Sequence, residues 1–274
     1  MPIAYILALL GTGVAVGFAS GLLGVGGCFI MIPVQYWVYT AMGVSTSVAI
    51  KLAFGTNLAV VLPTAFSGAM GHHRKGAVCW KAAMYLGGFG LIGAIGGATA
   101  AAHIPGMILK IAFGAAILLG GIRMLTAKPV KVEEQPKDSP RLWAALGFLL
   151  GVVTGLIGIG GGILMVPVMV LFLKFKMHQA VGTSTAMMVL TATGGLIGYI
   201  INGIGVSDIP SPHLGYFHLW SWLCLAATSI PMALVGARTA HKLPAKQLRI
   251  IFIIVMFYMG LKMIGVFSWL YLPI

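Results

Sequence analysis

The chain has 274 residues, of which 59% are hydrophobic and only 8% are charged. An ordinary globular protein has roughly half apolar and about a quarter charged residues, so this chain lacks the polar side chains to cover a water-soluble surface. Its apolar runs show no alternation with polar residues, which excludes a lipid-spanning β-barrel. We therefore expect an all-α polytopic membrane protein embedded in a lipid bilayer.

The net charge of +13 would favour nucleic-acid binding in a soluble protein. Here the basic residues lie in short tracts between apolar runs, which is typical of loops at the cytoplasmic face of a membrane. We therefore expect no nucleic-acid partner. The three cysteines lie within or beside apolar runs without C-x-x-C spacing, which favours small buried side chains over metal or redox roles. We expect no metal and no cofactor.

Long uncharged runs predict the membrane-spanning helices. Each is near or above the roughly 20 residues that one spanning helix requires. In chain order the runs are 1–50, 52–73, 82–109, 142–173, 177–207 and 209–237. Two shorter runs, 111–122 and 250–261, become long enough when the flanking lysines and arginines extend towards the membrane interfaces.

One segment breaks this pattern. Residues 127–141 hold three prolines and three of the four acidic residues of the chain. Such a composition predicts a solvated linker. We therefore expect a first transmembrane unit over 1–126, a linker over 127–141 and a second unit over 142–274.

The two units repeat each other. Residues 17–34 align without a gap on residues 151–168, with seven matched glycine, methionine and proline positions. Further along, residues 54–57 match 181–184. The register that pairs Gly97 with Gly236 continues to the end of each unit. An internal duplication with glycine-interrupted segments in corresponding places predicts a secondary transporter.

The loops of the two units differ in charge. The tract 72–75 is basic, whereas the corresponding residues 202–215 contain no lysine or arginine. Residues 41–47 are uncharged, whereas the corresponding residues 174–178 are basic. Under the positive-inside rule, equivalent loops then face opposite sides, which predicts two inverted-topology repeats. We expect a plasma-membrane protein with a cytoplasmic linker and both termini outside.

The run 142–173 is too long for one span and too short for two. A helix break at glycines 158–162 would leave residues 163–173 as a piece of about 16 Å. Each unit would then contain a glycine-broken or re-entrant helix pair followed by three longer helices. Such breaks are tolerated only where the freed backbone lines a cavity or packs within protein.

The glycines at these breaks are the first candidates for a binding site. Bare backbone amides at the start of a short helix, together with the helix dipole, bind anions without a buried charge. The alternative is that the glycines serve only close helix packing. The candidate positions are Gly26, Gly27, Gly160, Gly161 and Gly162.

Polar side chains at membrane depth are the second set of candidates, because each requires a partner or a water-filled cavity. Thr56, Asn57, Thr183, Ser184 and Thr185 occupy matching places in the two units. They either donate to the oxygens of an anion or bond to carbonyls of their own helices.

Lys51 is the only lysine or arginine before Arg74. It is either an interface anchor or the cation that attracts a negative substrate. All four acidic residues lie in the linker or in a loop, so no carboxylate is available in the membrane for a cation site or a proton relay. No set of residues suited to intramembrane hydrolysis is visible either, so we expect an anion transporter and not an enzyme.

The paired G-L-[LI]-G-[VI]-G-G motifs followed by a proline resemble the TauE/SafE family of sulfite and organosulfonate permeases. The G-T-[NS] motif in each unit and the [IL]-P-x-x-x-L-[KR] motif at each last helix extend the resemblance over nearly the whole chain. The resemblance implies a plasma-membrane permease for small sulfur-containing or organic anions, such as sulfite or sulfoacetate.

We accordingly expect a secondary transporter of small anions that works by alternating access at a midplane site between the two repeats. An anion channel is the alternative mechanism, and a carboxylate or thiosulfate are alternative substrates. A proton or a sodium ion is a possible coupling partner. The sequence is compatible with a monomer or a homo-oligomer.

Overall fold

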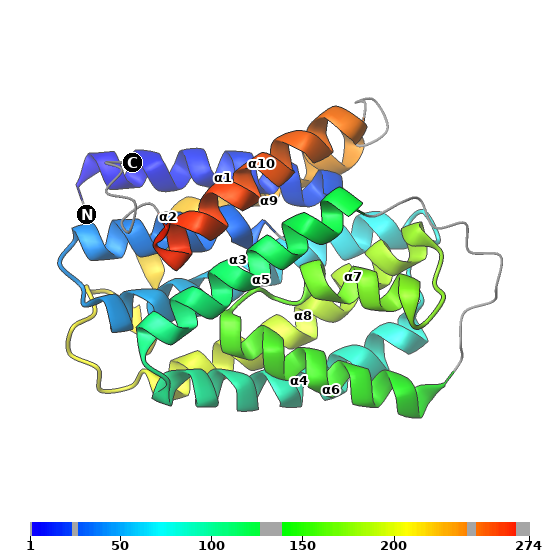
Figure 1. The fold of residues 1–274 in the computed structure, drawn as a ribbon, viewed down its shortest axis with the longest axis horizontal. Coiled ribbons are helices and arrows are strands. Elements are labelled where there is room, and N and C mark those ends of the chain that lie inside the picture. Colours follow the sequence, from blue (N-terminus) through cyan, green and yellow to red (C-terminus); the bar gives the residue numbers. More distant parts are fainter. Residues whose placement is uncertain (1, 24–26, 127–138, 240–244, 267–274) are drawn as a thin grey trace.

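The computed structural model describes residues 2–23, 27–126, 139–239 and 245–266. Ten helices make up almost all of this part of the chain (Figure 1). They are α1 (Ile3–Leu23), α2 (Cys28–Ala41), α3 (Thr46–His73), α4 (Trp80–His103), α5 (Gly106–Thr126), α6 (Pro140–Ile157), α7 (Gly162–Leu171), α8 (Met177–Asn202), α9 (Leu219–Thr239) and α10 (Ala245–Ile264).

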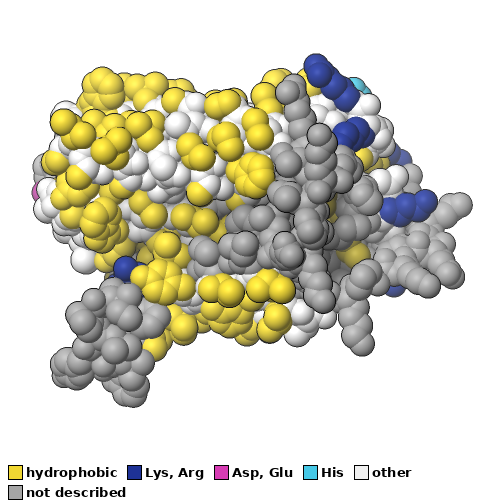
Figure 2. Space-filling view, turned by 90° about the horizontal axis from the view of Figure 1, so that it is seen from above, with side chains coloured by type: hydrophobic (Ala, Val, Ile, Leu, Met, Phe, Trp, Pro, Cys, Tyr) yellow, Lys and Arg dark blue, Asp and Glu magenta, His cyan; other side chains and the backbone are white. Residues whose placement is uncertain are grey.

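The surface is that of a membrane protein. Seven of the described helices are long and apolar enough to cross a membrane. Large hydrophobic side chains such as Leu119, Phe66 and Ile254 are exposed, and apolar side chains cover much of the middle of the visible face (Figure 2). Most of the visible lysine and arginine side chains gather at one end (Figure 2). The predicted all-α polytopic fold is confirmed.

The broken helices lie where the sequence predicts them. Gly158 ends α6 with a φ of 62° and Gly161 precedes α7 with a φ of 99°, a region of backbone space that glycine adopts without steric cost. The short helices α2 and α7 have 14 and 10 residues. Each unit therefore has a broken helix pair followed by three longer helices, as predicted.

The first helix of each unit packs against the fourth helix of the other unit. A Cβ added to Gly17 of α1 would overlap the backbone of Ser229 in α9. A Cβ added to Gly151 of α6 would overlap the backbone of Gly90 in α4. Ser229 and Gly90 are equivalent in the register that pairs Gly97 with Gly236. The glycine stripes therefore serve close helix packing, and they do so at matching places.

The third helices of the two units, α3 and α8, cross at the centre and run in opposite directions. Leu58 lies against Gly195, and ten residues further along α3 Gly68 lies against Thr185, ten residues earlier in α8. The fifth helices α5 and α10 are also antiparallel. Equivalent helices thus point in opposite directions, although the membrane orientation of the repeats stays a prediction.

A small β-hairpin precedes α9, and the sequence analysis did not predict it. Strands β1 (His213–Leu214) and β2 (Phe217–His218) pair antiparallel. The backbone N–H of Tyr216 donates to the carbonyl of Tyr199 in α8 over 3.2 Å. The hairpin is thereby held against the central helices, and it brings His218 to a buried position beside α3.

The glycine packing can be tested on two residues of α4. Gly93→Ala places a methyl group against the Phe148 carbonyl oxygen of α6, whereas nothing lies within 4 Å of the same group at Gly96. We expect Gly93→Ala to destabilise the protein by roughly 1–3 kcal/mol, because overpacking must shift backbone. Gly96→Ala is the matched control. Thermal unfolding of the detergent-solubilised protein measures both, and equal midpoints would contradict this packing.

Candidate functional site

The break between α6 and α7 lies at the crossing of the two central helices. A Cβ added to Gly160 would meet Val61 of α3 at 3.1 Å and Met188 of α8 at 3.6 Å. Val61 and Met188 occupy equivalent positions in the two units. The break therefore lies between equivalent positions of the two units, at the centre of the repeat. We call residues Gly158–Gly162 the central break.

Side chains of the central helices bond to the carbonyls that the central break leaves free. Asn57 Nδ2 donates to the Gly158 carbonyl over 2.7 Å. The Thr191 hydroxyl lies 3.2 Å from the Gly160 carbonyl oxygen, and the carbonyls of Met188 and Met187 in its own helix are next at 3.3 and 3.4 Å. Thr154 Oγ1 lies 3.2 Å from the position that a Cβ on Gly161 would occupy. These three side chains are buried. These two freed carbonyls are thus satisfied within the protein, as membrane depth requires.

The chemistry of the central break suits an anion. Its polar side chains are an amide and two hydroxyls, all neutral, and Gly161, which precedes α7, provides no side-chain cap. The start of a helix favours negative charge because of its backbone amides and dipole. Sequence reasoning identified Asn57 and the glycines but missed Thr154 and Thr191. The alignment that pairs residues 54–57 with 181–184 also pairs Thr64 with Thr191. This repeated threonine was the available signal for Thr191.

The matched threonines Thr56 and Thr183 join the two units. The backbone N–H of His218 donates to Thr56 Oγ1 over 3.0 Å, and that of Cys79 donates to Thr183 Oγ1 over 3.0 Å. His218 and Cys79 are equivalent residues, each one position before a fourth helix. The two hydrogen bonds therefore form a related pair, in which each threonine holds the start of the fourth helix of the other unit.

The polar candidates of the two units are not brought together. Thr185 contacts the position of Gly68, and Gly68 is twelve residues after Thr56 on α3, or about 18 Å of helix. Ser184 is buried, and its hydroxyl has no hydrogen-bond partner. The Thr185 hydroxyl donates to the Val181 carbonyl of its own helix over 2.7 Å. Among the predicted polar residues, Asn57 bonds directly to the central break.

Two further candidates have structural contacts. Lys51 Nζ donates to the Ala102 carbonyl in the last turn of α4 over 2.6 Å, where a positive charge interacts favourably with the helix dipole. Gly27 precedes α2 with a φ of 62° and packs closely on Val16. Gly26 lies outside the described residues.

A buried polar cluster lies beside Asn57, and sequence reasoning missed most of it. We define it as Gln35, Tyr39, Thr56, His218 and Ser221, all of which are buried. The Tyr39 hydroxyl lies 3.3 Å from Gln35 Oε1 and 3.4 Å from Thr56 Oγ1. The Tyr39 and His218 rings contact edge to face with their centroids 5.7 Å apart. A single glutamine within the apolar run before residue 50 was the signal available in the sequence.

The hydrogen bonds of His218 define its protonation state. The backbone N–H of Ser221 donates to His218 Nδ1 over 3.2 Å, so Nδ1 is an acceptor and the ring hydrogen is on Nε2. Burial lowers the pKa of His218 to about 4, which keeps the ring neutral at pH 7. His218 Nε2 and Gln35 Nε2 are both buried and have no hydrogen-bond partner.

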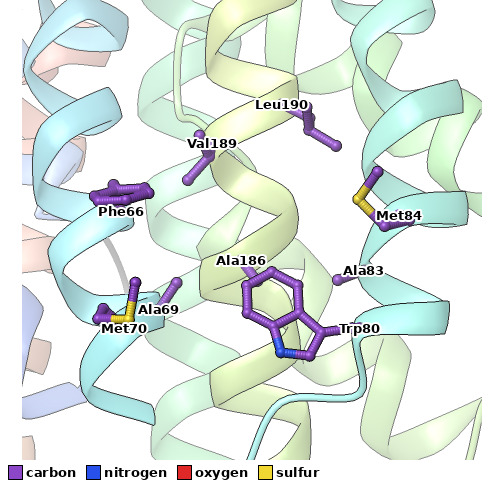
Figure 3. A pocket seen from close by; sticks show the side chains of 9 residues that line it. All are labelled: Phe66, Ala69, Met70, Trp80, Ala83, Met84, Ala186, Val189 and Leu190. Carbon is purple, nitrogen blue, oxygen red and sulfur yellow. The ribbon is translucent and has the colours of Figure 1, made fainter. Parts of the chain in front are cut away.

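An apolar cleft on the surface differs chemically from the central break and from the buried polar cluster. It lies between α3, α4 and α8 (Figure 3), and its lining contains apolar aliphatic, methionine and aromatic side chains. Ala83 lines this cleft, and its equivalent in the other unit is Trp222, whose indole Nε1 donates to the Ala59 carbonyl over 3.0 Å. The one side-chain nitrogen in its lining, Trp80 Nε1, donates to His73 Nδ1 over 3.0 Å, so it is not free to bind an anion.

The comparisons with known proteins agree with this architecture. The family model described as "Sulfite exporter TauE/SafE" matches residues 9–263. The chain belongs to the TauE/SafE family. TauE/SafE membership makes it a membrane transporter with multiple spans, not an enzyme.

Relatives of this TauE/SafE protein occur in archaea and bacteria. A "probable membrane transporter protein" of Methanocaldococcus jannaschii is 28% identical over 253 residues, which cover 92% of both chains. One of Haemophilus influenzae is 27% identical and covers 89% of this chain and 92% of its own. One of Xylella fastidiosa is 31% identical and covers 72% of this chain and 74% of its own. No solved structure matches the chain significantly.

The threonine bonds between the units can be tested by removing one acceptor at a time. Thr56→Val or Thr183→Val leaves a backbone N–H of His218 or Cys79 without its partner, and we expect a loss of roughly 1–3 kcal/mol in stability. Thr56→Ser and Thr183→Ser keep the hydroxyl and are the matched controls. Thermal unfolding in detergent is the measurement. Valine variants as stable as the serine variants would contradict a stabilising role.

Proposed function

We propose that this TauE/SafE protein is a secondary transporter of small anions, with sulfite or an organosulfonate as its substrate. The anion binds at the central break. The two units then rock about the crossing of α3 and α8 to expose the break to each face in turn, as in other transporters built from repeats.

The observation that carries this proposal is the position and chemistry of the central break. It combines an uncapped helix start with the neutral side chains of Asn57, Thr154 and Thr191. The buried polar residues of the described chain include no aspartate or glutamate. A site with donors and no carboxylate favours an anion over a cation.

The packing of the units supports alternating access. Matching contacts join α1 to α9 and α6 to α4, and the equivalent helices α3 and α8 run antiparallel. Because each contact has an equivalent made by the other pair of helices, each unit can adopt the conformation of the other, which opens the site to the opposite face. The mechanism requires the repeats to have inverted topology in the membrane. A channel with a continuous pore is the alternative, and it would give uptake that does not saturate.

The family description favours sulfite or an organosulfonate as the substrate. These anions offer several oxygens as hydrogen-bond acceptors for the backbone amides at the start of α7 and for the second Nδ2 hydrogen of Asn57. A carboxylate or thiosulfate presents similar acceptors and belongs in the same set of test substrates. The coupling ion is a proton or sodium, and imposed gradients of each distinguish them.

Transport by the reconstituted protein is the direct test. We expect saturable uptake of radiolabelled sulfite or sulfoacetate into proteoliposomes, above that of empty liposomes, with and without pH and sodium gradients. Asn57→Ala and Thr191→Val should each lower kcat/KM by about tenfold or more, because each removes a hydrogen bond at the break. Thr193→Val is the matched control, since the Thr193 hydroxyl bonds to the Val189 carbonyl of its own helix over 2.7 Å.

The outcomes of this test are distinct. Uptake equal to that of empty liposomes for every anion, under every gradient, would overturn the proposed function. Saturable uptake with Thr191→Val as active as Thr193→Val would place the binding site away from the central break.

We propose that the protein lies in the plasma membrane with the basic end inside, as the gathering of lysine and arginine side chains at one end supports (Figure 2). The linker 127–141 would then be cytoplasmic and both termini outside.

This orientation can be tested in intact cells with a membrane-impermeant thiol reagent. In a background with Cys28, Cys79 and Cys224 replaced by alanine, Asp208→Cys should be labelled from outside, because Asp208 is exposed in the neutral loop. Gln135→Cys should be labelled only after permeabilisation. The reverse pattern would overturn the orientation.

A further inference from the structure

Three members of the buried polar cluster have less polar counterparts in the repeat. In the register of the repeat, Met169 corresponds to Gln35, Cys79 to His218 and Ala82 to Ser221. Met169 and Ala82 are buried in a hydrophobic cluster against which Cys79 packs. Apolar side chains therefore suffice to pack the equivalent place. Packing thus does not explain the two donor groups of the cluster that have no partner, Gln35 Nε2 and His218 Nε2.

The cluster contains hydrogen-bond donors without partners. Gln35 Nε2 and His218 Nε2 are buried and make no hydrogen bond, and Nε2 carries the ring hydrogen because Nδ1 accepts from Ser221. A buried donor without a partner is costly, so such groups in proteins are nearly always matched by an acceptor. The cluster includes no carboxylate among its five members. An acceptor with negative charge fits these donors best.

The cluster is also next to the central break. Thr56 belongs to the cluster, and its neighbour Asn57 bonds to the Gly158 carbonyl of the break. The cluster lies on the side of the break towards the start of α3, whereas the basic tract 72–75 follows the other end of α3. An anion that leaves or enters the break on this side would meet the two donors.

We propose that the buried polar cluster is an oxyanion-binding subsite for the transported anion, in which Gln35 Nε2 and His218 Nε2 donate to its oxygens. The proposal rests on the proposed function. The equivalent place, formed by Met169 of the second unit and by Cys79 and Ala82 of the first, lacks these donors. The protein therefore binds the anion differently on its two sides. The two sides differ in the presence of two neutral hydrogen-bond donors, and neither side has a buried charge among these residues.

The counterpart residues provide the substitutions for the test. Gln35→Met and His218→Cys convert each donor into the residue that already packs in the other unit. We expect each to raise the KM for sulfite and sulfoacetate by about tenfold or more, because a hydrogen bond to a charged group is lost, with a smaller change in kcat. His218→Gln keeps an amide donor and should restore the KM to within about threefold of the wild type.

The controls separate binding from folding. Ser229→Ala removes a buried hydroxyl that also has no partner. Ser229 lies outside the cluster, in α9, where its backbone packs on Gly17 of α1. It should leave the KM unchanged. Thermal unfolding and gel filtration of every variant in detergent report on folding, and equilibrium binding of radiolabelled sulfite to the purified full-length protein gives a second affinity.

The outcomes distinguish this proposal from the proposed function. Wild-type uptake with a raised KM in Gln35→Met and His218→Cys, together with rescue by His218→Gln, supports the subsite. Wild-type uptake with unchanged KM and unchanged sulfite affinity in both variants overturns the subsite and leaves the transporter intact. A wild-type protein that takes up no anion of the series overturns the proposed function, and the subsite with it.

Discussion

The need to satisfy backbone polar groups away from water governs this structure. A continuous helix meets that need within itself, but a broken helix exposes carbonyl and amide groups at membrane depth. The carbonyls of Gly158 and Gly160 accept from Asn57 and Thr191. The backbone amides just before the fourth helices, those of Cys79 and His218, donate to the hydroxyls of Thr183 and Thr56. Polar side chains on α3 and α8 thus bind irregular backbone from elsewhere in the fold. The central position of these two helices follows from this role.

Close packing of the outer helices makes this centre possible. Gly17 and Gly151 let α1 and α6 approach the fourth helices until backbone contacts backbone. In lipid, where the hydrophobic effect does not drive helices together, such contacts supply much of the association energy. The glycines of the repeat therefore have two distinct uses. Those within α1 and α6 serve packing, and those at the breaks supply backbone conformations that other residues rarely adopt.

The two units have the same arrangement of helices but differ in the side chains at equivalent positions. Trp222 fills a position in one unit where Ala83 leaves an apolar cleft in the other. Gln35 and His218 occupy positions where the other unit has Met169 and Cys79. The backbone contacts are thus conserved between the units while the chemistry around the central break is not. This asymmetry is the feature expected of a transporter whose two faces meet different solutions.

The sequence by itself determined the membrane class, the number and order of the helices and the places of the breaks, because hydrophobic run length and glycine spacing act locally. The predicted linker lies mostly outside the described residues, and its last two residues, 140 and 141, belong to α6. The sequence also singled out Asn57, which bonds to the central break. Only the tertiary structure decided which polar residues meet. The antiparallel crossing of α3 and α8 separates Thr56 from Thr185, and the hairpin before α9 brings His218 to Tyr39 across 179 positions of the chain. Such contacts depend on how distant helices pack, and no local pattern of residues encodes them.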